Sequence, residues 1–146
     1  MKNQTIALVR YRDRVLIPTM SRTTQGYCLE TEPVIVHDVS DEAGLVASLV
    51  AAIEAGNPVV PTPSRSAWPK PVVLAPSGAK SMAALEREGA TWTIGCDGKH
   101  WTVYPSLTNA KGKWEPDMAR VEKIPTEISV VDLARRLARM VGNNKN

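Results

Sequence analysis

An internal repeat spans most of the 146 residues of this chain. Residues 5–57 and 90–143 carry the same succession of patterns. Each has two alternating runs typical of a β-hairpin, a polar turn with a glycine, an extended run interrupted by proline, and a helix with one apolar stripe. The two units align at an offset of 87 residues, which places Pro18 on Pro105 and Tyr27 on Trp114, with the first strand displaced by one. Because neither unit can bury its sheet face alone, we expect the two to share one core.

The patterns assign each segment a structure. In the first unit we expect a hairpin at 5–11 and 14–20, an extended run at 27–38 that Pro33 breaks or bulges, and a helix at 39–55. The second unit repeats this with 90–96 and 100–107, then 114–124, then a helix at 130–141. Ser129 with Asp132 forms a pattern similar to a capping box before that last helix.

A proline-rich crossover, 58–89, joins the two units within a single domain of residues 1–146. Its first 19 residues contain six prolines, which favour an extended path, and a strand at 72–74 and a helix at 80–88 are expected after them. The fold class is therefore α+β, with two antiparallel sheets from a duplicated unit and a helix after each. This order resembles the Whirly architecture, and that resemblance implies binding of single-stranded nucleic acid.

Charge is distributed unevenly along the chain. Residues 1–60 hold five basic and seven acidic residues, whereas residues 61–146 hold 13 basic and eight acidic residues. Between Thr23 and Ser64, 42 residues contain six acids and no Lys or Arg. The acids of this stretch that we consider for partner binding are Glu30, Glu32, Asp38, Asp41 and Glu42. They predict either a solvated face with helix-start carboxylates or a docking surface for a basic partner.

No catalytic constellation is recognisable, so we expect a binding protein rather than an enzyme. The histidines His37 and His100 have no ligand-spaced companions for a metal. The segment 77–81 lacks the glycines of a phosphate loop, and no nucleophile elbow is present. No cofactor is expected. The longest charge-free stretch in the helical part has 11 residues, against about 20 for a membrane span, so no membrane segment is expected either.

Two basic features offer alternatives to the acidic stretch. Four aromatic residues of the second unit lie near lysines, an arrangement that suits single-stranded nucleic acid but is also common in cores; they are Trp92, Trp101, Tyr104 and Trp114, near Lys99, Lys111 and Lys113. On the last helix, Arg135, Arg136 and Arg139 line one side and form either a solvated face or a contact for phosphate or an acidic protein. We expect nucleic acid binding to be weak and non-specific at most.

Three stretches carry a resemblance to a known group: 6–11 (IALVRY), 15–20 (VLIPTM) and 55–63 (AGNPVVPTP). They resemble small bacterial immunity proteins encoded beside contact-dependent growth inhibition toxins. The resemblance implies a cytoplasmic inhibitor that binds the C-terminal domain of a cognate toxin, often a nuclease that cleaves tRNA or DNA. A nuclease groove is basic because it neutralises phosphates, so the acidic stretch could imitate nucleic acid there. Glu30 and Glu32, which share one strand face, rank first, and Asp38 follows.

Overall fold

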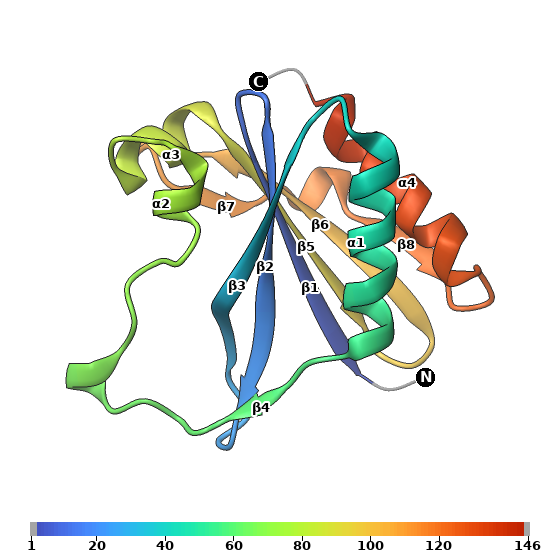
Figure 1. Cartoon of the computed structure of the whole chain (residues 1–146), viewed down its shortest axis with the longest axis horizontal. Helices are drawn as coiled ribbons and strands as arrows, with labels where there is room; N and C mark the ends of the chain where they lie inside the picture. Colours follow the sequence, from blue (N-terminus) through green and yellow to red (C-terminus); the bar gives the residue numbers. More distant parts are fainter. Residues whose placement is uncertain (1–2, 145–146) are drawn as a thin grey trace.

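Strands from both halves of the chain join one sheet in the computed structural model, which describes residues 3–144. The order is β3-β2-β1-β5-β6-β7, with β4 on β2 and β8 on β6 (Figure 1). The strands are β1 (Gln4–Tyr11), β2 (Arg14–Thr23), β3 (Cys28–Asp38), β4 (Val59–Val60), β5 (Ala90–Cys96), β6 (His100–Thr108), β7 (Trp114–Pro116) and β8 (Glu122–Pro125). The helices are α1 (Glu42–Ala55), α2 (Leu74–Ser77), α3 (Met82–Glu88) and α4 (Val130–Gly142), with short 3₁₀ turns η1 (Arg65–Ala67) and η2 (Met118–Arg120).

The α+β class is confirmed, but the two expected sheets are two halves of one. The first strands of the two units, β1 and β5, pair antiparallel from Gln4 with Cys96 to Arg10 with Ala90. This ladder closes what would otherwise be an open edge of each half-sheet. All pairings are antiparallel except the short parallel pair of β2 with β4.

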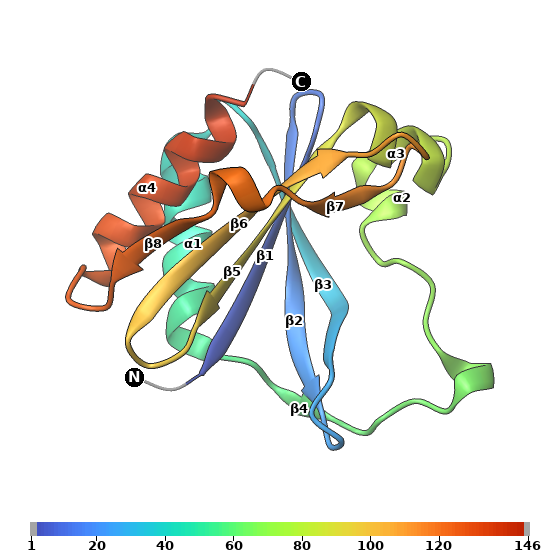
Figure 2. The same ribbon diagram turned by 180° about the vertical axis from the view of Figure 1, so that it is seen from behind.

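Helices α1 and α4 lie side by side on one face of the sheet (Figures 1 and 2). Beneath them is the larger core, to which α1 contributes Leu45, Leu49 and Ile53. Alternation along each strand sends the remaining apolar residues to the opposite face. There Val9, Tyr11 and Leu16 pack with Val73 and Leu85 of the α2–α3 segment, which covers one end of that face.

A single register of 87 residues does not describe how the two halves pack. On the face under the long helices, Ile17 of β2 corresponds to Val103 of β6, an offset of 86. When the two long helices are compared, the buried residues Leu45 and Leu49 of α1 correspond to Leu133 and Leu137 of α4, an offset of 88. One residue of shift matters in a strand because it turns each side chain to the other face. That the two units arose by duplication stays a prediction.

The crossover departs from expectation at 72–74. No strand forms there. Val73 adopts a helical backbone conformation, because its side chain is buried against the face of the sheet opposite α1 and α4, and α2 begins at Leu74. The expected helix at 80–88 is present as α3, which Ser81 caps by accepting from Ala84 N at 3.1 Å. Before α2, the chain from Pro61 runs as an extended strap that bows away from the sheet (Figure 2).

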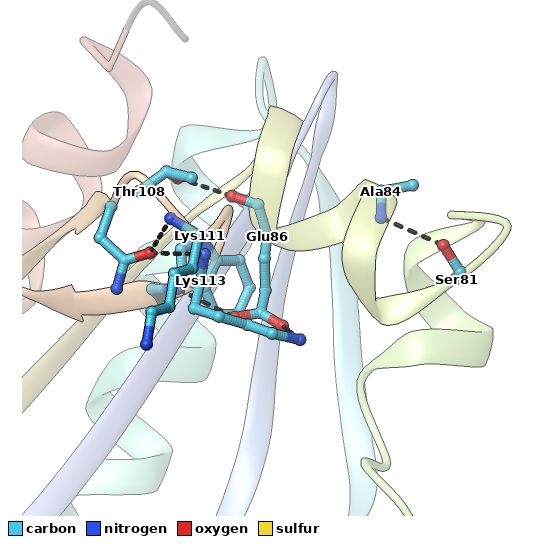
Figure 3. A network of polar contacts seen from close by, with 8 residues as sticks. Ser81, Ala84, Glu86, Thr108, Lys111 and Lys113 are labelled. Atoms are coloured by element: carbon cyan, nitrogen blue, oxygen red, sulfur yellow. Dashed lines mark hydrogen bonds and ion pairs between the residues drawn. The ribbon is translucent and has the colours of Figure 1, made fainter.

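The buried carboxylate of Glu86 holds the turn between β6 and β7 against α3 (Figure 3). It accepts from Trp114 N at 2.9 Å and lies 3.5 Å from Lys113 Nζ, while Thr108 Oγ1 donates to the Glu86 carbonyl at 2.6 Å. Trp114 also donates from its indole to the carbonyl of Gly89 at 3.3 Å. The second half of the sheet is thereby fixed to the crossover.

Candidate partner-binding surface

Strand β3 stands at the outer end of the sheet and carries three of the candidate acids, Glu30, Glu32 and Asp38. Only one of its edges is paired within the described residues, by β2. Its side chains include the exposed apolar residues Ile35 and Val36, which are 42% and 43% exposed. With Asp41 and Glu42 at the start of α1, the three acids form what we term the acidic surface. Ile35 and Val36 are neighbours in the strand and point to opposite faces of the sheet, so each face of β3 has one exposed apolar side chain. An edge strand with exposed apolar residues and acids suits a protein partner.

Glu30 is half-buried, and burial raises the pKa of its carboxyl. Its Oε2 atom is buried and has no hydrogen-bond partner within the described chain. A buried carboxylate oxygen without a donor is unfavourable, and a cation of another molecule would reach it only after the side chain turned outward. Glu32, by contrast, is exposed, as is Asp38 at the end of the same strand.

Asp38 and Asp41 are engaged in local structure. Asp38 accepts from the hydroxyl and the backbone N–H of Ser40 at 2.6 and 2.9 Å, and these bonds lower the pKa of Asp38. Asp41 caps α1 by accepting from Gly44 N at 3.0 Å and lies 3.2 Å from His37 Nδ1. The other ring nitrogen of His37 lies 2.7 Å from Ser48 Oγ. Their charges still face solvent, but their positions are determined by the turn into α1.

The alternative basic residues on α4 each have an acidic neighbour in the same chain. Arg135 lies 3.6 Å from Asp132, and Arg139 lies 3.7 Å from Glu42 of α1. Arg136 pairs with Glu122 of β8. The acidic surface and the basic helix face therefore meet at the Glu42–Arg139 pair. Because these arginines are exposed and paired, they form a balanced surface rather than a strongly positive one.

An exposed aromatic pair beside β3 was not anticipated from the sequence. Tyr27, in the turn before β3, is 56% exposed, and Trp68, in the strap, is 48% exposed. Their rings meet edge to face with centroids 6.4 Å apart. The two residues are 41 positions apart in the sequence, so no local pattern indicates that they pair. A Trp within a proline-rich run could still have been considered as a candidate surface residue. Tyr and Trp are frequent anchors at protein interfaces.

The aromatic cluster of the second unit is largely core. Trp92 and Trp101 are buried under the long helices, 4% and 1% exposed. Tyr104 and Trp114 are half-buried and line a cavity of about 410 Å³ on the sheet's other face, together with Thr91 and Thr93. The expected row of stacking platforms is thus reduced to two partly covered rings. Among residues 3–144, no group of His, Cys, Asp and Glu could hold a metal ion.

Comparisons with known proteins show a likeness in fold to solved structures, but they do not assign this chain to a family. No protein-family model matches the chain, and no curated protein matches it. A protein of unknown function from Neisseria meningitidis superposes with a TM-score of 0.64 at 13% identity, covering 94% of this chain and 93% of that one. A chain of a CdiA-CT/CdiI toxin and immunity complex from Yersinia pseudotuberculosis superposes with a TM-score of 0.61 at 15% identity, covering 96% and 97%.

These matches support an immunity-protein-like fold, as the sequence resemblance implied, and leave the Whirly resemblance without support. No helix in the described part of the chain is long and apolar enough to cross a membrane. Both likenesses extend over nearly the whole of each chain, so the arrangement of β1 to α4 is shared as a unit. At 13% and 15% identity they show the fold alone.

Proposed function

We propose that this chain is an immunity protein that binds and neutralises the toxin domain of a contact-dependent growth inhibition system. The observation that carries the proposal is the likeness, over 96% of this chain, to a chain of a toxin and immunity complex. The surface chemistry agrees with a binding role, because β3 offers exposed apolar side chains beside acids. The protein would act in the cytoplasm as an inhibitor without catalysis of its own.

The toxin domain in this proposal is a nuclease with a basic groove, acting on tRNA or DNA. Glu32 and Glu30 supply the first contacts with that groove, and Asp38, Asp41 and Glu42 add to the negative potential. The Oε2 atom of Glu30 is buried and unpartnered in the free chain, so Glu30 joins the contact by turning its side chain outward, where an Arg or Lys of the partner would complete its hydrogen bonding. Tyr27 and Trp68 supply the aromatic anchors next to the charged contacts. The arginines of α4 are the less favoured candidates for the toxin contact, because each is paired with an acid of this chain.

The test is protection of cells. The toxin domain that this proposal expects to be encoded beside this chain is expressed from an inducible promoter, with or without the chain, and surviving colonies are counted. Protection by this chain, and none by an immunity protein of another toxin, is the expected result. Equal killing with and without the chain, at matched and soluble expression, would contradict the proposal.

A further inference from the structure

A polar cavity of about 630 Å³ lies at the end of the sheet where the β1–β2 turn, the end of α3 and η2 meet. Three arginines from these three segments line it: Arg12, Arg87 and Arg120. Glu88 and Ser106 also contribute to its wall. None of these residues belongs to the acidic surface or to the basic face of α4. Three guanidinium groups around one cavity indicate a site for an oxyanion.

Arg12 is held in place by the rest of the fold. Its φ of 54° is the one positive value at a non-glycine residue among residues 3–144, a conformation that persists where the surroundings enforce it. Arg10 Nε donates to the Arg12 carbonyl at 3.1 Å, and Arg10 Nη1 donates to Val141 O at the end of α4 at 2.8 Å. The Arg12 guanidinium lies 5.1 Å from the Tyr11 ring centroid and 3.3 Å from Glu88.

The other two arginines are brought to the cavity by close packing and by an ion pair. At Gly89 an added Cβ would lie 2.7 Å from the Arg10 carbonyl, so the glycine lets the end of α3 approach β1. This approach brings Arg87 to the same cavity as Arg12. Arg120 is oriented by Asp117, 2.6 Å from its Nε, and its Nη2 lies 3.5 Å from Ser106 O. The backbone positions of all three arginines, and the side chain of Arg120, are therefore set by the fold before any ligand arrives.

The arginines keep hydrogen-bonding capacity for a ligand. Each guanidinium has five N–H donors, of which Arg12 uses one and Arg120 two on described partners. Arg87 makes no hydrogen bond or ion pair with another described residue, although its charge helps to lower the pKa of Glu88 after the larger effect of the Tyr11 hydroxyl. The side chains of Arg12 and Arg120 are 70% and 62% exposed, so a ligand can reach them.

The surrounding acids determine which oxyanion fits. Glu88 lines the cavity and Asp117 adjoins it, so these two carboxylates offset two of the three positive charges. Glu86 and Glu115 lie on the neighbouring α3 and β7. A nucleic acid strand needs a row of unopposed cations for its successive phosphates, and here it would meet the carboxylates of Glu88 and Asp117. Glu86 does not add to them, because it is buried against Trp114 and Lys113. A single carboxylate needs only the one bidentate guanidinium that Arg87 offers.

We propose that this cavity, termed the arginine pocket (Arg12, Arg87 and Arg120), binds the carboxylate of an acidic side chain on the toxin domain. The proposal rests on the proposed function, because it names the group on that same partner. It gives the chain a second contact of opposite polarity to the acidic surface. Complementarity of both signs fixes orientation and excludes partners with the reverse pattern.

The test uses the isolated chain, labelled with ¹⁵N at arginine, and follows the side-chain Nε–Hε signals by NMR. Glutarate is the carboxylate probe and dimethyl phosphate is the phosphodiester probe. We expect saturable shifts of the Arg12, Arg87 and Arg120 signals with glutarate, and weaker shifts with dimethyl phosphate. Arg87→Ala should weaken glutarate binding about tenfold, as expected for loss of a charge-assisted pair. Arg65→Ala, in the distant η1, is the matched control and should leave it unchanged.

Three results would overturn the proposal: no saturable shift with glutarate, glutarate binding unaffected by Arg87→Ala, or tighter binding of dimethyl phosphate, which would identify a phosphate site. Since no toxin is present, failure here leaves the cell-protection result standing. If the toxin fails to bind while glutarate shifts the arginine signals, the partner is wrong and the oxyanion site remains.

Discussion

The side chain of Asn57 pairs with the backbone of Thr5 in the manner of a neighbouring strand residue. Asn57 Nδ2 donates to Thr5 O at 2.8 Å, and Asn57 Oδ1 accepts from Thr5 N at 2.9 Å. The same Nδ2 donates to Met20 O at 2.9 Å. Strands β1 and β2 pair only near their shared turn, at 9–11 with 14–16, and diverge beyond it (Figure 1). Asn57 thus bridges the two strands where their ladder has ended.

Replacing Asn57 with Ala should lower the free energy of unfolding by about 1–3 kcal/mol, because it leaves part-buried backbone groups of Thr5 and Met20 without partners. Urea denaturation measures the change. Asn143→Ala, at the exposed end of α4, is the matched control. An effect of Asn57→Ala no larger than that of the control would contradict the bridging role.

Glu86→Ala should destabilise the chain by about 1–3 kcal/mol, since the Trp114 N–H loses its acceptor in a part-buried setting. Glu86→Gln keeps an acceptor oxygen and should be clearly milder. Urea denaturation followed by tryptophan fluorescence compares the two variants. If Gln and Ala are equally damaging, the Glu86 contribution comes from its charge beside Lys113 rather than from the Trp114 bond.

Glu30 should reduce stability at neutral pH. Burial raises its pKa in the folded state, so the folded chain binds the proton more tightly than the unfolded chain does. The free energy of unfolding therefore falls as pH rises from the ordinary glutamate range through the raised folded pKa. Glu30→Gln should be more stable than the natural chain at neutral pH, and the difference should disappear near about pH 3, where both states are protonated. A difference that is independent of pH would contradict this.

Glu32→Lys should slow association with the toxin domain without changing stability, because Glu32 is exposed and its charge lies in the acidic surface. Glu54→Lys, an exposed acid on α1 with the same charge change, is the matched control. Stopped-flow association rates at low and high salt compare the two variants. Equal rates for both variants and the natural chain would exclude the acidic surface as the contact.

The sequence predicted the helices and strands better than it predicted which strands pair with one another. Alternation and capping residues identified both hairpins and both long helices, because these signals are local. The single joined sheet depends on the pairing of β1 with β5, whose paired residues are 80 to 92 positions apart, and no local pattern specifies it. The 87-residue register failed at Leu16, which aligns with Val103 in the sequence but faces the other side of the sheet.

The acidic surface could be read from composition, but the environment of each acid could not. Nothing in the sequence separates Glu30, which burial penalises, from Glu32, which is exposed. The arginine pocket was invisible for the same reason, since Arg12, Arg87 and Arg120 come from segments that only the tertiary fold assembles. The sequence predicted that Arg135, Arg136 and Arg139 share one helix face, but it did not predict which acids on α1, β8 and α4 pair with them.

We expect this chain to form a specific complex with a toxin domain. Isothermal titration calorimetry of the purified chain with the toxin domain encoded beside it measures this most directly. We predict a one-to-one complex with a dissociation constant of about 10⁻⁷ M or tighter, within the range of specific complexes of standard size, together with loss of the toxin's activity at equal concentration. No binding heat at about 10⁻⁵ M of each folded protein, at two temperatures, with toxin activity unchanged, would contradict it.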